Sequence, residues 1–295
     1  MAGDSTSSRG GGPPIEFVTR RAVAEPTCGG YRSLFKGQGS DFSELRAYEP
    51  GDDVRHIDWN VTARSGEPWV RVYEEERELT VFLLVDVSGS MAYGSHQGLK
   101  SDSSARLAAT LVRSAQRAGD RVGLITFADR VLSVDPPRKG RAHATRLLER
   151  LALPVDAGPG TDLRGALHRL LELRRRSAMV FVLSDFAAAP YDDLLRAAAA
   201  RYDLVPVVLR DRAEWALPSD GLVRLRDAET GALVAIDSSD PAVRRAWQSA
   251  AVAEHARRAH LFRALHLSPL ELEAADDAVR ALSNLMLRRA AGRRP

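Results

Sequence analysis

Three oxygen-bearing side chains follow one short apolar run at a spacing of two residues. The run covers 81–85 and is rich in residues that favour β-structure, so it predicts a strand buried on both faces. Asp86, Ser88 and Ser90 come directly after it, and Gly89 allows the backbone to turn between the two serines. Because alternate residues of extended chain point the same way, the three oxygens can converge on one point. Oxygen ligands of this kind suit a hard divalent cation, Mg²⁺ in particular.

Two further oxygen-bearing residues occupy comparable places in the chain. Thr161 follows Gly-Pro-Gly and precedes a predicted helix, and Asp185 comes after a second apolar run at 178–183. Each has a simpler explanation on its own, since threonine before a helix is usually an N-cap and aspartate after a strand commonly caps a turn. Together with Asp86, however, they place oxygens at the same edge of one predicted sheet. They meet there if the strand order reverses between Asp86 and Asp185.

The elements that must position these residues alternate between strand and helix. Apolar runs predict strands at 81–85, 121–127, 131–134, 178–183, 204–209, 223–225, 233–236 and 270–272, and amphipathic stretches predict helices at 103–118, 142–151, 161–175, 191–201, 240–265 and from 277 onward. This alternation predicts an α/β fold whose doubly wound, mostly parallel sheet is covered by helices on both faces. In such sheets, ligands bind at the carboxyl edge where the strand order reverses.

Composition along the chain divides it into four parts. We expect a disordered tail at 1–28, a small β-rich segment at 29–78, the α/β domain at 79–210, and a hairpin with helices packed on that domain at 211–295. Within the second part, 61–63 and 69–73 flank a turn and predict a β-hairpin. The helix from 240 carries Val243, Ala246, Trp247 and Ala250 on one face, which we expect to face the core.

The β-rich segment holds a second group of polar residues. Asp52, Asp53, His56 and Asp58 could form a second metal or catalytic site. The alternative, which we favour, is that they cap turns and brace the hairpin, because aspartate readily bonds to the local backbone. Trp59 and Trp69 are expected to be packing residues rather than a platform for a ligand.

Charge and composition exclude several classes of protein. The 42 basic and 39 acidic residues leave a net charge of +3, and the arginines at 174–176 and 288–294 are interpreted as solvated helix ends rather than a nucleic-acid surface. Cys28 is the sole cysteine, which excludes an internal disulfide and favours a reducing compartment. Neither a signal peptide nor an apolar run of the roughly 18–20 residues needed to span a bilayer is visible. We therefore expect a cytoplasmic protein without membrane insertion.

Enzymatic motifs are weak. The stretch 94–101 comes near a phosphate-binding loop, but Leu99 stands where that pattern needs glycine. Ser88 lacks the glycine flank of a nucleophile elbow. The chain is therefore expected not to be an enzyme. A metal-dependent hydrolase stays open as the alternative, with the same ion as Lewis acid and Asp185 or His96 as the general base.

The five oxygen-bearing residues together resemble a known site. Asp86-x-Ser88-x-Ser90 with Thr161 and Asp185 is similar, at all five positions, to the metal-ion-dependent adhesion site (MIDAS) of von Willebrand factor A-type domains. The resemblance implies that the three hydroxyls touch Mg²⁺, Mn²⁺ or Ca²⁺ and that the two carboxylates act mainly through bound water. A cation held mostly by neutral hydroxyls keeps much of its charge, so it favours an Asp or Glu carboxylate from a protein partner.

The upstream segment narrows the resemblance to one family. Tyr48-Glu-Pro-Gly-Asp-Asp53, then Ile57-Asp58-Trp59, and the stretch at 221–227 resemble the bacterial family of domains of unknown function called DUF58, over about 29–289. The genes of that family commonly stand beside genes for MoxR-type AAA+ ATPases. The resemblance therefore implies an adaptor or co-chaperone whose partner is such an ATPase, in a family without an established reaction.

Overall fold

The computed structural model describes residues 42–73, 79–92, 99–153, 158, 160–173, 178–188, 190–211, 214–217, 219, 221–226, 232–273 and 276–291. The chain divides into two compact units, Arg21–Glu78 and the remainder, Met1–Arg20 with Leu79–Pro295. The tail predicted at 1–28 lies outside the described residues.

The smaller unit pairs two strands around two short helices. Its described elements are β1 (Phe42–Ala47), the 3₁₀ helix η1 (Val54–His56), α1 (Trp59–Ser65) and β2 (Trp69–Tyr73), and β1 pairs antiparallel with β2. The hairpin predicted between 61–63 and 69–73 is therefore wrong, because 61–63 belong to α1. Asp58 caps the start of that helix and Gly66 ends it in the left-handed region (φ 80°), so the expected turn serves as a helix C-cap. The packing role expected for Trp59 is also wrong, since that side chain is 69% exposed.

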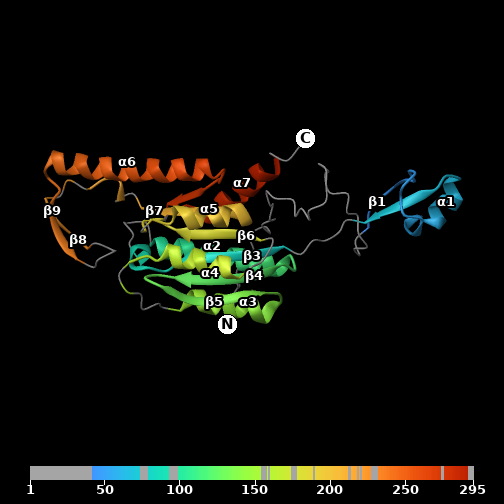
Figure 1. Cartoon of the computed structure of the whole chain (residues 1–295), viewed down its shortest axis with the longest axis horizontal. Coiled ribbons are helices and arrows are strands. Elements are labelled where there is room, and N and C mark those ends of the chain that lie inside the picture. Colours follow the sequence, from blue (N-terminus) through green and yellow to red (C-terminus); the bar gives the residue numbers. More distant parts are fainter. Residues whose placement is uncertain are drawn as a thin grey trace, which may run out of the picture. The chain divides into compact units, whose positions relative to one another are not determined.

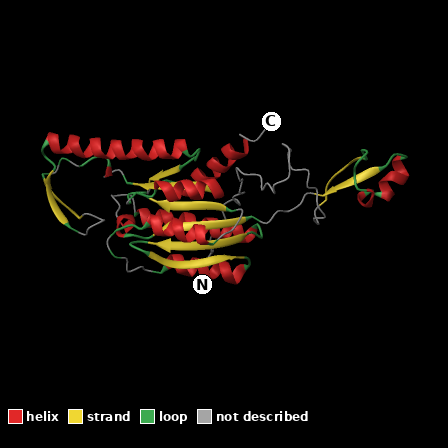
Figure 2. Ribbon diagram, viewed as in Figure 1, coloured by secondary structure: helices red, strands yellow, loops and turns green. Residues whose placement is uncertain are grey.

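The larger unit contains one six-stranded sheet (Figures 1 and 2). Its strands, in spatial order, are β10 (Leu270–Glu273), β7 (Asp203–Arg210), β6 (Met179–Ser184), β3 (Thr80–Asp86), β4 (Arg121–Phe127) and β5 (Val131–Arg138). Neighbours pair in parallel except β4 and β5, which are antiparallel. The edge strand β5 contains Pro136 and Pro137 just before its last residue, and edge positions tolerate proline because they need fewer ladder donors. The predicted α/β fold with a mostly parallel sheet is confirmed.

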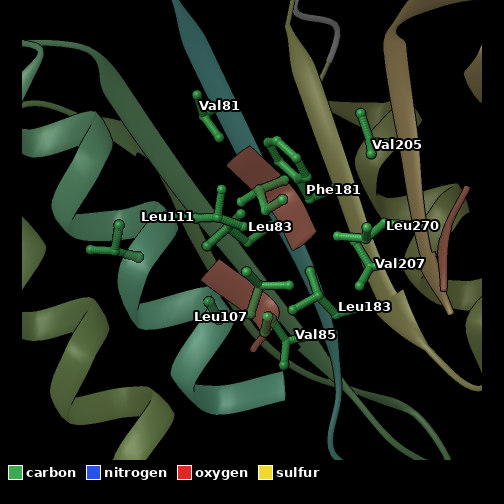
Figure 3. Packing of buried hydrophobic residues seen from close by; sticks show 14 of the residues in the cluster. Val81, Leu83, Val85, Leu107, Leu111, Phe181, Leu183, Val205, Val207 and Leu270 are labelled. Carbon is green, nitrogen blue, oxygen red and sulfur yellow. The ribbon is translucent and has the colours of Figure 1, made fainter. Parts of the chain in front are cut away.

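Helices cover both faces of this sheet, as the prediction of a double winding requires. One face packs on α2 (Lys100–Arg117), α3 (Arg141–Ala152) and α7 (Ala278–Ala291). The other packs on α4 (Leu163–Glu172), α5 (Asp192–Arg201) and the last turns of α6 (Pro241–Ala264). Alternate residues of β3 point to opposite sides. Leu83 and Val85 join the α2 side, where Figure 3 shows Leu83 beside Leu111 and Val85 beside Leu107, and Phe82 joins the other side. Both faces of β3 are thus buried, which fixes the strand's register and the position of Asp86 at its end.

The strand order reverses between β3 and β6. From β3 the chain proceeds through β4 to β5 on one side, and it then returns to build β6, β7 and β10 on the other side. The helices that follow β3 and β6, α2 and α5, pack on opposite faces of the sheet, so the loops that leave the carboxyl ends of these two strands part in opposite directions. This is the arrangement at the ligand-binding edge of such sheets. This reversal is the condition under which the sequence predicted that Asp86 and Asp185 would meet.

The C-terminal part departs from prediction in two places. The hairpin of β8 (Leu222–Arg226) and β9 (Leu233–Asp237) is confirmed. The core-facing stripe predicted on α6 is wrong, because Ala246 and Ala250 are exposed and the buried residues are in its last turns. Figure 1 shows why: the first half of α6 extends beyond the sheet, toward β8 and β9. Arg289, predicted to be solvated, is instead buried and paired with Asp203.

None of the helices in the described ranges combines the length and the apolar character that crossing a lipid bilayer would require.

Candidate metal centre

The centre is built on Asp86, the last residue of β3, which is 1% exposed. Its Oδ1 accepts hydrogen bonds from the backbone N–H of Ser88 (2.9 Å) and from the Ser88 hydroxyl (2.6 Å). After Ser88 the chain turns at once into the 3₁₀ helix η2 (Gly89–Ala92), which the Met91 N–H closes on the Ser88 carbonyl (3.0 Å). This tight turn brings the Ser90 hydroxyl within 3.1 Å of the Ser88 hydroxyl. The local sequence alone therefore gathers the first three oxygens.

Thr161 reaches the same point from another part of the chain. Its hydroxyl donates to Ser88 Oγ at 3.0 Å, across 73 positions of sequence. The backbone beside it is held at the end of β4, where the Asp162 N–H donates to the Ala128 carbonyl. The alternative reading of Thr161 as an N-cap is wrong, because Asp162 caps α4 by accepting from the Gly165 N–H at 2.7 Å. The Thr161 hydroxyl thus serves the centre and not the helix.

Asp185 completes the group from the end of β6. Its Oδ1 accepts from the Ala187 N–H (3.1 Å), its Oδ2 accepts from Lys100 Nζ (2.9 Å), and the Ser90 hydroxyl also bonds to it. All five residues predicted from the sequence are therefore buried and joined in one hydrogen-bonded network. Thr161 connects through Ser88 to Asp86, and Ser88 connects through Ser90 to Asp185.

The turn that carries Asp185 is strained and tightly held. Phe186 has a φ of 58°, in the left-handed region that bulky residues rarely adopt. Its buried ring packs on Tyr191 and on Phe262 of α6, and these contacts hold the turn in position. Arg258 of α6 also donates to the Asp185 carbonyl at 3.0 Å. Packing and one buried guanidinium therefore hold Asp185 in place.

Sequence reasoning missed two residues, Ser184 and Lys100, whose side chains bond to the carboxylates of the centre. Ser184 donates to Asp86 Oδ2 at 2.6 Å and accepts from the Phe186 N–H at 3.0 Å. Lys100 is 1% exposed, and its Nζ lies 2.9 Å from Asp185 Oδ2 and 2.5 Å from Glu214 Oε1. One signal could have identified Lys100. It is among the few lysines of an arginine-rich chain, and it opens a helix, where the helix dipole disfavours a cation.

The two carboxylates have different electrostatic surroundings. Burial and the nearby charge of Asp185 raise the pKa of Asp86 from its ordinary 3.8 to about 7, although hydrogen bonds from Ser184 and Ser88 oppose the rise. Burial would also raise the pKa of Asp185, but the charge and hydrogen bond of Lys100 hold it below its ordinary value. Near neutral pH, Asp185 is therefore ionised while Asp86 lies near its titration midpoint, where an added positive charge would favour its ionised form.

The chemistry of the donors fits a hard divalent cation. The group offers two carboxylates and three hydroxyls, all of them oxygen ligands of the kind that Mg²⁺, Mn²⁺ and Ca²⁺ prefer. No cluster of three or more His, Cys, Asp or Glu side chains suited to a metal occurs in the part of the chain that the structure describes. A cation at this centre would therefore depend on the hydroxyls of Ser88, Ser90 and Thr161.

The second polar group, in the smaller unit, has a local explanation. Asp53 caps η1 by accepting from the Arg55 N–H at 2.9 Å, and Asp58 caps α1 by accepting from the N–H groups of Asn60 (3.0 Å) and Val61 (3.2 Å). Asp52 binds Arg46 and the backbone N–H of Glu49. The expectation that these carboxylates cap turns is confirmed. His96, offered as a base for the alternative hydrolase, lies outside the described residues.

Comparisons with known proteins point to one family and its relatives. The family model described as "Protein of unknown function DUF58" matches residues 44–257. The uncharacterized protein Rv1480 of Mycobacterium tuberculosis is 34% identical over 267 residues, which cover 89% of this chain and 84% of that protein. The uncharacterized protein YeaD of Bacillus subtilis is 24% identical over 124 residues, 42% of this chain and 29% of that one.

Solved structures similar to this chain include two with a TM-score below one half. The conserved hypothetical protein BatB from Bacteroides thetaiotaomicron has a TM-score of 0.44 and 14% identity, over 72% of this chain and 99% of that chain. The SpRpn10 VWA domain has a TM-score of 0.41 and 10% identity, over 71% of this chain and 95% of that chain.

Proposed function

The chain belongs to the DUF58 family, whose function is unknown, and we propose that it is a divalent-cation-dependent interaction module. The observation that carries the proposal is the network of buried oxygens that three distant segments bring to one point at the carboxyl edge of the sheet. Ser88, Ser90 and Thr161 would hold the cation, and Asp86 and Asp185 would balance its charge. When bound, the cation supplies a positive centre for one anionic ligand from outside the chain.

The partner would supply that ligand as an Asp or Glu side chain. Because three of the five donors are neutral hydroxyls, the cation keeps a charge that a carboxylate can neutralise. The family resemblance names a MoxR-type AAA+ ATPase as the candidate partner, with this chain as its adaptor or co-chaperone. That assignment depends on the family, and the residues of the centre specify only that the partner is acidic.

The hydrolase alternative is less well supported by the same residues. A general base needs a free lone pair and a pKa near the working pH. Both oxygens of Asp185 already accept hydrogen bonds, and Lys100 lowers the pKa of its carboxyl. Asp185 is therefore a poor base, which weakens the form of the hydrolase alternative that depends on this carboxylate.

The first test is cation binding by two matched variants. Thr161→Val removes one hydroxyl of the centre without changing the size of the side chain. Thr126→Val does the same to a threonine that is equally buried but bonds to Ser133 in the neighbouring strand (2.7 Å). Isothermal titration with Mn²⁺ and then Mg²⁺ should show an affinity about tenfold weaker or worse in Thr161→Val, and wild-type affinity in Thr126→Val. Equal affinity in both variants would mean that the cation binds elsewhere.

The second test uses a purified MoxR-type ATPase from the same organism, immobilised for biolayer interferometry. Wild type and Thr126→Val should bind it in Mg²⁺ and dissociate in EDTA, and Thr161→Val should bind weakly in both. Binding that survives EDTA would remove the cation from the mechanism. No binding in any condition, with cation affinity intact, would leave the module but reject this partner.

A further inference from the structure

An ammonium group is buried beside the candidate centre, and nothing in the five-residue pattern calls for it. Lys100 Nζ lies between two carboxylates, 2.9 Å from Asp185 Oδ2 and 2.5 Å from Glu214 Oε1. Its side chain is 2% exposed, whereas that of Glu214 is 36% exposed. A buried charge is costly unless it is paired, and here the pair is made with a residue of the centre itself.

The position of Lys100 is unfavourable for the helix that carries it. It is the first residue of α2, and the preceding Leu99 provides no side-chain cap. A cation at a helix N-terminus is opposed by the helix dipole. The carboxylates of Asp185 and Glu214, not the helix, therefore account for the lysine at this point.

Glu214 holds the same ammonium from the more exposed side. Its Oε2 accepts from the Asp211 N–H (3.3 Å), and its carbonyl accepts from the indole N–H of Trp247 in α6 (3.0 Å). The segment after β7 is thereby tied both to α6 and to Lys100. Asp185 and Glu214 thus hold the Lys100 ammonium from two sides, so this side chain is a buried part of the centre's surroundings.

We infer that Lys100 is a built-in counter-charge that keeps the centre intact without metal and keeps its affinity for free divalent cations low, so that the cation and a partner's carboxylate bind cooperatively. This inference rests on the proposed function. The charges around Lys100 support it. The ammonium offsets one of the three negative charges of Asp86, Asp185 and Glu214, so the group attracts a divalent cation less strongly than it would without the lysine. A partner's carboxylate supplies again the negative charge that Lys100 offsets, so each ligand strengthens the binding of the other.

Two variants change the charge in opposite directions. Lys100→Met keeps the length of the side chain and removes its charge. In the absence of a partner, this variant should bind Mg²⁺ at least tenfold more tightly than wild type. Its melting temperature in EDTA should be lower than that of wild type, and added Mg²⁺ should raise that melting temperature by more. Glu214→Gln removes a partly exposed negative charge and should weaken Mg²⁺ binding by about threefold, since one charge acts through partly exposed surroundings.

The control is Arg289→Met, which removes the cation of another buried pair. Arg289 pairs with Asp203 at the amino end of β7, the opposite edge of the sheet from the centre. This variant should lose stability in EDTA and keep wild-type Mg²⁺ affinity, which separates a general loss of stability from an effect on the centre. If Lys100→Met does not fold, Glu214→Gln decides the question, because weaker Mg²⁺ binding supports the inference and unchanged or tighter binding overturns it.

The outcomes distinguish the two proposals. Unchanged or weaker Mg²⁺ binding in Lys100→Met, with binding still sensitive to Thr161→Val, overturns the counter-charge and leaves the proposed function standing. Absence of Mg²⁺ binding in wild type and in Lys100→Met alike overturns both. Tighter binding in Lys100→Met together with weaker binding in Glu214→Gln supports the counter-charge.

Discussion

Aspartates gather in two parts of this chain, and they use their oxygens differently. Asp53 and Asp58 accept from backbone N–H groups two or three positions away. Asp86 accepts from Ser184, 98 positions away, and Asp185 accepts from Lys100 at a separation of 85 positions. The first group is dense in sequence and serves local turns. The second is dispersed in sequence and is assembled by the sheet.

The difference shows that acidic residues crowded in sequence are weak grounds for a binding site. A carboxylate that caps a helix spends its lone pairs on the backbone, whereas hydroxyl oxygens that donate to a neighbour keep lone pairs for a ligand. The surroundings differ as well. Between 45 and 70, where side chains of the smaller unit are described, Asp58 and Val70 are the buried residues. The larger unit buries both faces of β3 and so can hold charged groups away from water.

The largest expected effect comes from breaking the buried ion pair of the centre. Asp185→Ala leaves the Lys100 ammonium with Glu214 alone, and removing one partner of a buried pair costs about 3 kcal/mol or more of unfolding free energy. Hydrogen exchange of the β3 and β6 amides in EDTA measures this loss within the larger unit. If the free energy of unfolding fell by less than about 1 kcal/mol, the Lys100–Asp185 pair would be as weak as an ion pair on the protein surface. The two groups of aspartates would then not differ in their electrostatic contribution to stability.

The next effect is a pH dependence that belongs to Asp86. Burial and the Asp185 charge raise its folded pKa to about 7, above its ordinary 3.8, so the folded chain binds this proton more tightly than the unfolded chain. The stability that this proton contributes is complete below about pH 4 and is lost as pH rises through about 7. Asp185, with its lowered pKa, is ionised in both the folded and the unfolded chain above about pH 5, so it adds little to the pH dependence of stability between pH 5 and pH 8.

We therefore expect metal-free wild type to lose stability from pH 5 to pH 8 relative to Asp86→Asn, which has no such proton to release. Thermal unfolding of both proteins in EDTA at several pH values measures the difference, and contributions from histidines cancel because both chains share them. Parallel curves would show that the pKa of Asp86 is not raised in the folded chain.

A smaller effect is expected from Ser184→Ala. The hydroxyl donates to Asp86 and accepts from the Phe186 N–H, so its loss leaves a buried backbone donor unsatisfied and costs about 1–3 kcal/mol. Because the same hydrogen bond lowers the pKa of Asp86, the pH at which stability is lost should also move upward. Hydrogen exchange at pH 5 and pH 8 tests both. If the variant lost stability but the pH of that loss did not rise, Ser184 would support the turn without affecting the pKa of Asp86.

Much of the fold and of the candidate centre could be predicted because each depended on short-range pattern. The apolar run of β3 and its exit into Asp86 are visible in consecutive residues. Thr161 and Asp185 needed one further fact, the reversal of strand order, which alternation of strand and helix makes common in such sheets. Pattern and topology together therefore brought five residues to one point.

The remainder depended on contacts that no window of sequence contains. Lys100 finds its partners across 85 and 114 positions, so nothing near it indicates burial. In the smaller unit, the β-favouring Val61 and Thr62 became helical because Asp58 caps one end and Gly66 the other. On α6, periodicity predicted a buried face but not how far the sheet extends beneath the helix.

The smallest effects should come from the capping aspartates, compared as a pair. Asp58→Ala removes a largely buried acceptor of two N–H groups and should cost about 1 kcal/mol in the amides of α1. Asp53→Ala removes an exposed cap of a three-residue helix and should cost a few tenths. Neither should change Mg²⁺ affinity, because these carboxylates accept from backbone N–H groups of their own helices and the centre is assigned to five other residues. A change in Mg²⁺ affinity in Asp58→Ala would join the two groups of aspartates and would show that the smaller unit contributes to the centre.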